Sequence, residues 1–186
     1  MINLLTKNKF FIILVIVLVI TFILNLFLKE KPNDKESLPP KSNQANYQSL
    51  TPGTSTKEDV LDKLGKPVAE EENGGILNYS SSSSERPHQV VLEENNIKLI
   101  KEIVTLRDEK KTIDIQNVYG KPKNVLYGDR SSAGFHLFIY PENGIAYIGQ
   151  AESGLLLEVW YFPPTTFELF KTTYASEYSL TLQQSQ

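Results

Sequence analysis

A tripeptide that occurs twice constrains the fold of this chain more than any other feature. Gly65-Lys66-Pro67 recurs as Gly120-Lys121-Pro122, 55 residues further along. Before each copy lies a short run with apolar residues at helical spacing, and after each copy lie stretches typical of β-strands. Glycine favours the C-terminal cap of a helix, and proline prevents the helix from continuing. The sequence therefore predicts two copies of one helix-and-sheet unit.

The predicted units share one order of elements. In the first unit, Thr56 stands three residues before Asp59 in a variant of the capping box, and apolar residues follow at helical spacing. We expect strands at 76–79, 89–93 and 97–106 in the first unit, and at 135–140, 145–149 and 155–162 in the second. The predicted fold class is α+β: an N-terminal transmembrane helix, then two tandem units, each a short helix packed on a three-stranded antiparallel sheet.

A further helix is predicted near the C-terminus. Pro163-Pro164 ends the last predicted strand, and Phe167, Phe170 and Tyr174 follow with the spacing of one helix face. We expect this short amphipathic helix to cover the second sheet.

The N-terminal region contains the most apolar stretch of the chain. Residues 10–28 carry no charge, and as a helix they would extend about 28 Å, close to the hydrocarbon thickness of a bilayer. No small-residue cleavage site follows and the chain has no cysteine to carry a lipid, so we expect an uncleaved anchor. Lysines are nearly balanced on its two sides. We expect the C-terminal domain to be extracytoplasmic, with cytoplasmic placement as the alternative.

The predicted organisation has five parts. Residues 29–48 contain three prolines and mixed charge, and they have too little apolar surface to offset the entropy of ordering. The parts are a short flank at 1–9, the membrane anchor at 10–28, a flexible linker at 29–48, the first repeat at 49–106, and the second repeat with a C-terminal helix and a frayed tail at 107–186.

The stretch from Leu50 to Pro67 resembles the SmpA/OmlA (BamE-like) family and the tandem-repeat β-lactamase inhibitor proteins. The resemblance lies in the Pro52-Gly53 turn that opens the helix and the Leu-Gly-x-Pro sequence that closes it. In the second unit it extends only to 119–122 and the following hairpin. The resemblance implies a helix packed on a small antiparallel sheet, and a function in binding other proteins, either in outer-membrane assembly or in enzyme inhibition. This chain lacks the lipidated cysteine of the first group and the disulfides of the second.

Few residues are candidates for chemistry. The net charge of −3 argues against nucleic-acid binding, which requires a basic face. A serine from 80–84, His88 and an acid could be assembled into a triad, but no nucleophile-elbow motif supports it. The two histidines, His88 and His136, lie far apart, and no spacing of ligands suggests a metal site. We expect no catalytic residue, no cofactor, no metal and no small-molecule substrate, and therefore not an enzyme.

Aromatic residues near the ends of the last strands are the candidates for partner binding: Tyr140, Tyr147, Trp160 and Tyr161. Adjacent residues on a strand point to opposite faces, so Trp160 and Tyr161 cannot share one core. These residues either pack in the core and under the C-terminal helix or anchor another protein. Strand edges are also available for β-augmentation.

The predicted function is that of a membrane-anchored, non-catalytic protein-binding domain in cell-envelope assembly or maintenance. The alternative is an anchored inhibitor of an extracytoplasmic enzyme. In that case a loop, at 73–75 or at 129–134, would insert into the active site of the target.

Overall fold

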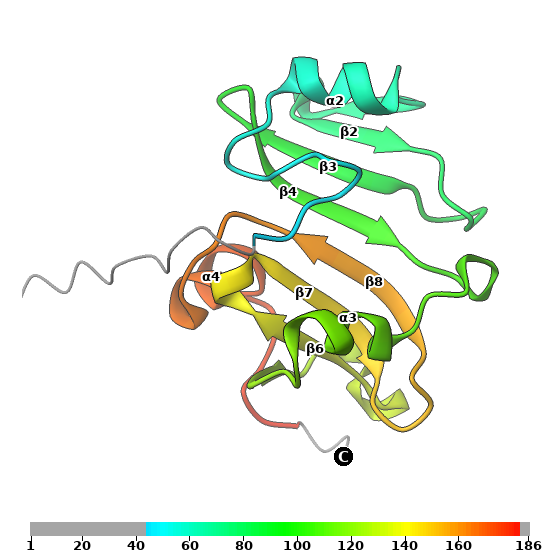
Figure 1. The fold of residues 1–186 in the computed structure, drawn as a ribbon, viewed down its shortest axis with the longest axis vertical. Helices are drawn as coiled ribbons and strands as arrows, with labels where there is room; N and C mark the ends of the chain where they lie inside the picture. The colour runs from blue at the N-terminus through cyan, green and yellow to red at the C-terminus, as the bar shows by residue number, and fades with distance from the viewer. Residues whose placement is uncertain (1–43, 183–186) are drawn as a thin grey trace, which may run out of the picture. The chain divides into compact units, whose positions relative to one another are not determined.

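A computed structural model of the protein describes residues 44–182 (Figure 1). These residues form one eight-stranded antiparallel sheet with strand order β1-β2-β3-β4-β8-β7-β6-β5, together with three α-helices. The first unit contains α2 (Lys57–Leu64), β1 (Ala69–Glu71), β2 (Ile76–Tyr79), β3 (His88–Glu93) and β4 (Asn96–Ile103). The second unit contains α3 (Thr112–Tyr119), β5 (Asn124–Leu126), β6 (Phe135–Tyr140), β7 (Ile145–Gln150) and β8 (Leu156–Tyr161). The third helix, α4 (Phe167–Tyr174), follows β8.

The prediction of a separate three-stranded sheet in each unit is wrong, for two reasons. Each unit has a fourth strand, β1 or β5, directly after its helix, and each of these strands is only three residues long. The two half-sheets also join, because β4 pairs with β8 from Ile100–Tyr161 to Ile103–Glu158. Without that pairing, two long edges with free N–H and C=O groups would remain. The fold class is therefore one continuous eight-stranded sheet.

The transmembrane part of the predicted fold class is not found in the described residues. Residues 10–28 lie outside them, as do the flank at 1–9 and most of the linker at 29–48. Between residues 44 and 182, no helix combines the length and the apolar character needed to cross a membrane. Within residues 44–182, the corrected fold class is the eight-stranded sheet with three short α-helices.

The helix of the first unit begins and ends where the sequence predicts. The backbone N–H of Asp59 donates to the Thr56 hydroxyl, and the N–H of Thr56 donates to the Asp59 carboxylate over 2.7 Å. Gly65 ends the helix with φ of 76°, a left-handed value that side chains rarely adopt. Short-range capping therefore fixes both ends of α2.

One tertiary contact occurs in both units and attaches each helix to its sheet. The Tyr79 hydroxyl on β2 donates to the carbonyl of Gly65 over 3.1 Å. The Tyr140 hydroxyl on β6 donates to the carbonyl of Gly120 over 2.7 Å. The two tyrosines therefore occupy equivalent positions, and they provide the reference for aligning the other strands of the two units.

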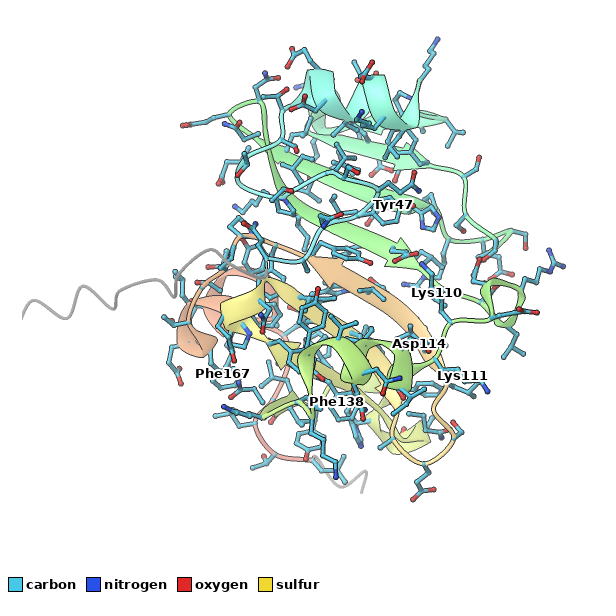
Figure 2. The ribbon with its side chains drawn as sticks, viewed as in Figure 1. Tyr47, Lys110, Lys111, Asp114, Phe138 and Phe167 are labelled. Atoms are coloured by element: carbon cyan, nitrogen blue, oxygen red, sulfur yellow. The ribbon has the colours of Figure 1, made fainter. Side chains whose placement is uncertain are left out.

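The sheet has two faces, which are covered differently. α2, α3 and the segment before α2 lie on the side that we call the helix face, which is turned toward the viewer in Figure 1. α4 packs on the opposite side, called here the rear face, where Phe170 joins a cluster with Trp160 and Phe162. Figure 2 shows Phe138 on the helix face beneath α3 and Phe167 on α4.

The fold begins earlier than the predicted domain boundary at residue 49. Ala45 and Tyr47 are buried on the helix face, and the N–H of Ala45 donates to the carbonyl of Asn143 over 2.8 Å. Figure 2 shows Tyr47 in front of the sheet, and its ring lies 5.7 Å from the ring of Tyr161. Ala45 and Tyr47 therefore bring the end of the predicted linker into the core.

Candidate partner-binding surface

The structure does not bring the four predicted aromatic residues together on one surface. Tyr140 and Tyr147 are buried on the helix face beneath α3, where Gln116 donates to the Tyr147 hydroxyl over 3.0 Å. Trp160 is on the rear face, with 2% of its surface exposed, beneath Phe170 and beside Tyr178. Tyr161 is half-buried on the helix face. Of the two interpretations of these residues, their burial favours packing.

A different part of the sheet lacks a helical cover. We call the rear face of the first unit the open half-face; it comprises Ile76, Asn78, Gln89, Val91, Leu99 and Lys101. Of these residues, only Leu99 and, partly, Val91 join the apolar cluster beneath α4. The corresponding half of the second unit provides most of that cluster. Asn78 and Leu99 are buried and the other four residues are partly exposed, so the open half-face is the part of the rear face that α4 leaves partly accessible.

A polar row crosses the open half-face at right angles to the strands. Asn78, Gln89 and Lys101 are register partners on β2, β3 and β4, and Trp160 continues the row on β8. The Asn78 amide donates to Glu71 over 2.6 Å, and the Gln89 amide donates to the Asn78 side-chain oxygen over 3.2 Å. The Lys101 ammonium lies 4.5 Å from the centre of a Trp160 ring, within cation–π range. Neighbouring contacts thus order the row.

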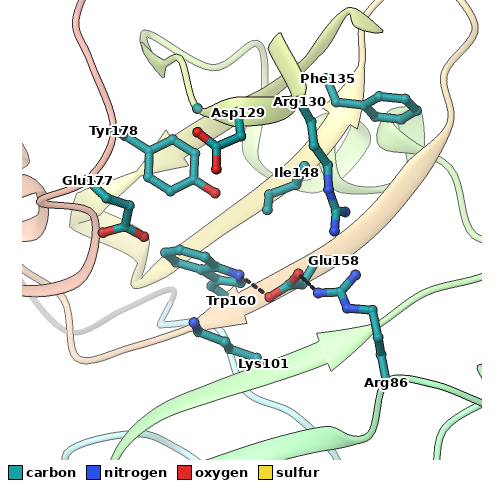
Figure 3. Close-up of a pocket in the computed structure, with 11 residues that line it drawn as sticks. Arg86, Lys101, Asp129, Arg130, Phe135, Ile148, Glu158, Trp160, Glu177 and Tyr178 are labelled. Carbon is teal, nitrogen blue, oxygen red and sulfur yellow. Dashed lines mark hydrogen bonds and ion pairs between the residues drawn. The ribbon is translucent and has the colours of Figure 1, made fainter. Parts of the chain in front are cut away.

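The row ends at a pocket of about 300 Å³ on the rear face (Figure 3). Its base is the buried Glu158 carboxylate, which accepts hydrogen bonds from Trp160 Nε1 over 2.7 Å and from Arg86 over 2.5 Å. Figure 3 shows the side chain of Arg130 reaching toward Glu158, with Tyr178 on another wall. A buried charge needs such partners, because a carboxylate without them would lose its hydration at a cost of several kcal/mol.

The rim of the pocket carries charges of both signs. Among residues 44–182, Lys101 and Arg130 form no ion pair with a carboxylate, and Asp129 and Glu177 form none with a cation. Burial raises the pKa of Tyr178 to about 12, and the charge of Glu158 adds to the effect. The phenol therefore keeps its proton near neutral pH and can donate a hydrogen bond. The pocket suits a charged or strongly polar side chain.

Sequence reasoning missed most of this site. Trp160 was among the predicted residues, and Arg130 lies in the loop at 129–134 proposed for the inhibitor alternative, but Arg86, Lys101 and Glu158 were not predicted. One signal was present: Glu158 interrupts an otherwise apolar strand at 156–161. A carboxylate at a position that alternation assigns to the interior indicates a buried polar contact.

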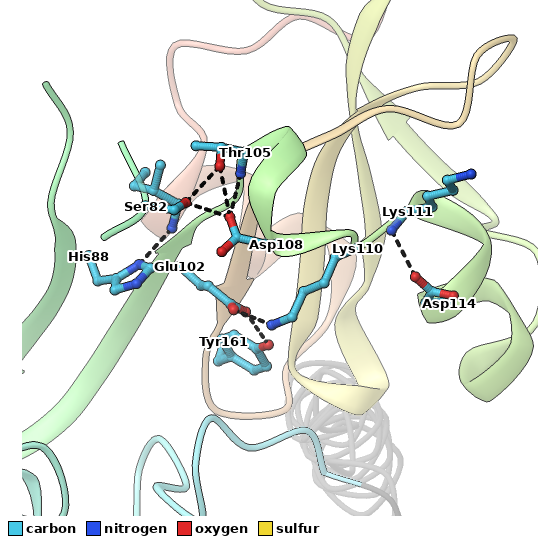
Figure 4. Close-up of polar contacts among 10 residues, drawn as sticks. Ser82, His88, Glu102, Thr105, Asp108, Lys110, Lys111, Asp114 and Tyr161 are labelled. Atoms are coloured by element: carbon cyan, nitrogen blue, oxygen red, sulfur yellow. Dashed lines mark hydrogen bonds and ion pairs between the residues drawn. The ribbon is translucent and has the colours of Figure 1, made fainter. Parts of the chain in front are cut away.

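A second buried carboxylate lies on the helix face (Figure 4). Glu102 accepts hydrogen bonds from the Tyr161 hydroxyl over 2.8 Å and from Lys110. Burial raises the pKa of Tyr161, and the charge of Glu102 raises it further, so the phenol remains a donor. Both oxygens of Glu102 are occupied, which indicates a structural role at the junction of the two units.

His88 is not arranged as a general base. His88 Nδ1 accepts the backbone N–H of Ile103 over 3.0 Å, so in the neutral ring the other nitrogen carries the proton and neither lone pair is free. Burial lowers the pKa of His88. The Ser82 hydroxyl donates directly to Asp108 over 2.5 Å instead of to a histidine (Figure 4). His136 packs edge-on to Tyr127, with ring centres 4.9 Å apart.

Side chains that bind metal ions do not cluster in the described part of the chain. There, no group of three or more histidine, cysteine, aspartate or glutamate side chains is arranged to hold a metal ion.

No protein-family model matches the sequence, and no curated protein matches it significantly. Among solved structures, the chain is similar to a DUF4309 family protein (YjgB) from Bacillus subtilis subsp. subtilis str. 168. The two chains are 16% identical, the similarity covers 64% of this chain and 87% of that chain, and the TM-score is 0.44. This likeness is too weak to support a shared function. The resemblance to the SmpA/OmlA family stays a prediction.

Proposed function

We propose that this protein is a non-catalytic protein-binding domain whose partner occupies the open half-face. The observation that carries the proposal is the unequal cover of the rear face. α4 packs on the half that the second unit forms, and from the first unit it reaches only Leu99 and Val91. Gln89 and Lys101 of the polar row remain partly exposed and can contact another molecule.

The chemistry of the row indicates the kind of partner. Gln89 presents a partly exposed amide group, which pairs with peptide groups and polar side chains, and Lys101 adds a positive charge. The buried Asn78 side chain accepts a hydrogen bond from Gln89 and thereby orients it. At the end of the row, Arg86 and Arg130 border a pocket that has room for one side chain. Arginine is enriched among residues that contribute strongly to binding energy. We infer a polar segment of another protein, with one charged side chain in the pocket.

The location of the interaction rests on sequence alone. Residues 10–28 are uncharged, which supports attachment to a membrane, and we propose that the domain acts beside that membrane in the cell envelope. Attachment would raise the effective concentration of the domain toward a partner at the same surface.

The test is affinity capture of the full-length protein from its native membrane after chemical crosslinking. Lys101→Glu reverses a charge in the middle of the row, and Lys123→Glu makes the same change at an exposed site of the second unit outside the row. We expect one stoichiometric partner with the wild type and with Lys123→Glu, and at least about tenfold less of it with Lys101→Glu, which corresponds to ~1.4 kcal/mol. Equal capture by both variants, or no stoichiometric partner, would contradict the proposal.

The inhibitor alternative uses the same surface and makes a further prediction. The loop at 129–134, one of the two proposed for insertion, contributes Asp129 and Arg130 to the rim of the pocket. If the captured partner is an enzyme, adding the full-length protein should lower its activity, and Arg130→Ala should relieve that inhibition. An enzyme that binds but keeps its full activity would exclude the inhibitor interpretation.

A further inference from the structure

A second pocket lies on the helix face of the first unit, away from the open half-face. It has a volume of about 360 Å³ and lies between the end of α2, the start of β3 and the turn at 47–50. Its principal polar residues are Tyr47, Lys63, Lys66, Tyr79, Ser80 and His88.

The lining of this pocket is rich in hydrogen-bond donors and contains no carboxylate. Lys63 and Lys66 supply ammonium groups, and Ser80 supplies a hydroxyl. Because His88 Nδ1 accepts a backbone N–H, its second ring nitrogen is a donor. Burial raises the pKa of Tyr47, so this phenol also keeps its proton. The pocket therefore favours an anion that has several acceptor atoms.

Carboxylates near the pocket are already held by other groups. Glu102 pairs with Lys110 and Tyr161, and Asp108 accepts hydrogen bonds from Ser82 and Thr105. The Lys63 ammonium lies 3.7 Å from Asp62, where both side chains are mostly exposed and the pair is weak. Lys66 forms no ion pair with any residue between 44 and 182. At least one ammonium group is thus available.

The second unit shows that the fold does not require these donors. The helices align at a separation of 55 residues, which places Val118 opposite Lys63. Tyr79 and Tyr140 are equivalent, so Ser80 corresponds to Pro141, and their strand partners His88 and Ile145 correspond to each other. Three donors of the first unit are therefore replaced by groups without a side-chain donor, although the helix, its glycine cap and its tyrosine contact remain.

The turn that borders the pocket is held in an uncommon conformation. Gln48 and Ser49 have φ of 50° and 67°, values that are unfavourable for residues other than glycine. The turn is closed by reciprocal backbone hydrogen bonds between Tyr47 and Leu50 of 3.0 and 2.8 Å. Backbone strain of this kind is concentrated at functional sites. In this protein, the strained turn holds Tyr47 and Gln48 at the edge of the pocket.

We propose that this pocket binds a phosphate group, carried either by a small soluble molecule or by a lipid headgroup. A phosphate offers several acceptor oxygens in a tetrahedral arrangement and binds ammonium and N–H donors through charge-assisted hydrogen bonds. Donors from α2, from the Gly-Lys-Pro segment and from β3 approach it from different elements. This site is separate from the proposed protein-binding surface, and either could exist without the other.

The test uses the full-length protein in neutral detergent, with its histidine rings labelled for NMR. Inorganic phosphate is titrated at constant pH, with chloride at the same ionic strength as the reference. We expect a saturable shift of the His88 ring signals with phosphate. Lys66→Ala should weaken binding about tenfold, which corresponds to ~1.4 kcal/mol. Lys121→Ala, at the same position of the second Gly-Lys-Pro copy, should leave the affinity unchanged.

The outcomes separate the site from general electrostatic attraction. No saturable shift, an equal shift with chloride, or equal weakening by the two lysine variants would overturn the proposal. Thermal unfolding of Lys66→Ala should match the wild type, which excludes misfolding as the cause of lost binding. Glycerol 1-phosphate then represents a soluble ligand. Discs of phosphatidylcholine with and without phosphatidylglycerol represent a lipid headgroup, which would shift the His88 signals without added phosphate.

Discussion

The two halves of the rear face have the same strand framework but opposite surface chemistry. When the units are aligned on Tyr79 and Tyr140, Asn78 of the first unit corresponds to Ile139 of the second. Gln89 corresponds in the same way to Ala146. The same alignment places Lys101 opposite Trp160, and these two residues are also register partners at the junction of the half-sheets. Three substitutions of polar for apolar residues therefore separate the open half-face from the half beneath α4. Hydrophobic burial decides which half the chain covers.

The largest loss of stability is expected when a polar residue of the open half-face is placed at the equivalent buried position beneath α4. Ala146 is 0% exposed, so Ala146→Gln would force a larger side chain into a packed site, at about 1–3 kcal/mol. A buried amide without partners would add about 1–3 kcal/mol. The reverse change on the open half-face, Gln89→Ala, removes the hydrogen bond to Asn78 and should cost only about 0.5–1.5 kcal/mol. Denaturant unfolding followed by circular dichroism measures both variants. Similar losses would mean that the two halves are equally buried.

The packing of α4 on the rear face of the second unit should contribute strongly to stability. Phe170 is 0% exposed and contacts the rings of Trp160 and Phe162. Phe170→Ala should lower the free energy of unfolding by about 3–5 kcal/mol. Leu169 is its neighbour on α4 and 55% exposed, so Leu169→Ala is the control, with a loss within about 0.5 kcal/mol. If Phe170→Ala behaved like the control, α4 would not stabilise the second half.

The hydrogen bond from a tyrosine hydroxyl to the glycine that ends the helix occurs in both units, but it should contribute unequally to the free energy of unfolding. Tyr140→Phe and Tyr79→Phe each remove one hydroxyl that donates to a glycine carbonyl, which should cost about 0.5–1.5 kcal/mol. The loss should be larger for Tyr140, because its bond is 2.7 Å against 3.1 Å and it is more deeply buried. Urea unfolding of the two variants gives the difference. A larger loss for Tyr79 would show that the helix of the first unit depends more on this contact.

A loss of stability is also expected at alkaline pH. Burial raises the pKa of Tyr174 and of Tyr178 to about 12, from an ordinary value of 10.0. Glu93 adds to the shift at Tyr174, and Glu158 and Glu177 add at Tyr178, where Arg130 opposes them and Asp129 adds weakly. Their stabilising contribution is therefore complete below pH 10 and is lost as the pH rises toward 12.

The double variant Tyr174→Phe/Tyr178→Phe removes both titrating groups of the cover. Its free energy of unfolding should vary less with pH between 10 and 12 than that of the wild type. An unchanged slope in this range would show that other groups cause the alkaline loss.

Local signals in the sequence predicted the local structure well. α2 follows from Thr56, Asp59 and Gly65, because capping depends on residues within one turn. β1 could not be recognised, because its three residues are all exposed and show no alternation. The pairing of β4 with β8 joins residues about 60 positions apart, and no local pattern reports it.

The candidate site was harder to predict than the fold. Aromatic residues suggested a binding surface, but tyrosine and tryptophan serve equally well in a core, and only burial distinguishes the two roles. The open half-face depends on which half α4 covers, and α4 follows the whole sheet in sequence. Asn78 and Gln89 gave no signal by themselves, because polar residues on one face of a strand are usual in antiparallel sheets.

The most direct test of the central claim places a photo-activated crosslinking residue at position 89 of the full-length protein in its native membrane. The control places the same residue at Val118, which is 71% exposed on α3 of the other face. The account predicts one discrete adduct with another protein from position 89, none from position 118, and loss of the adduct when Lys101→Glu is added. No adduct from position 89, or the same adduct from both positions, would contradict binding at the open half-face.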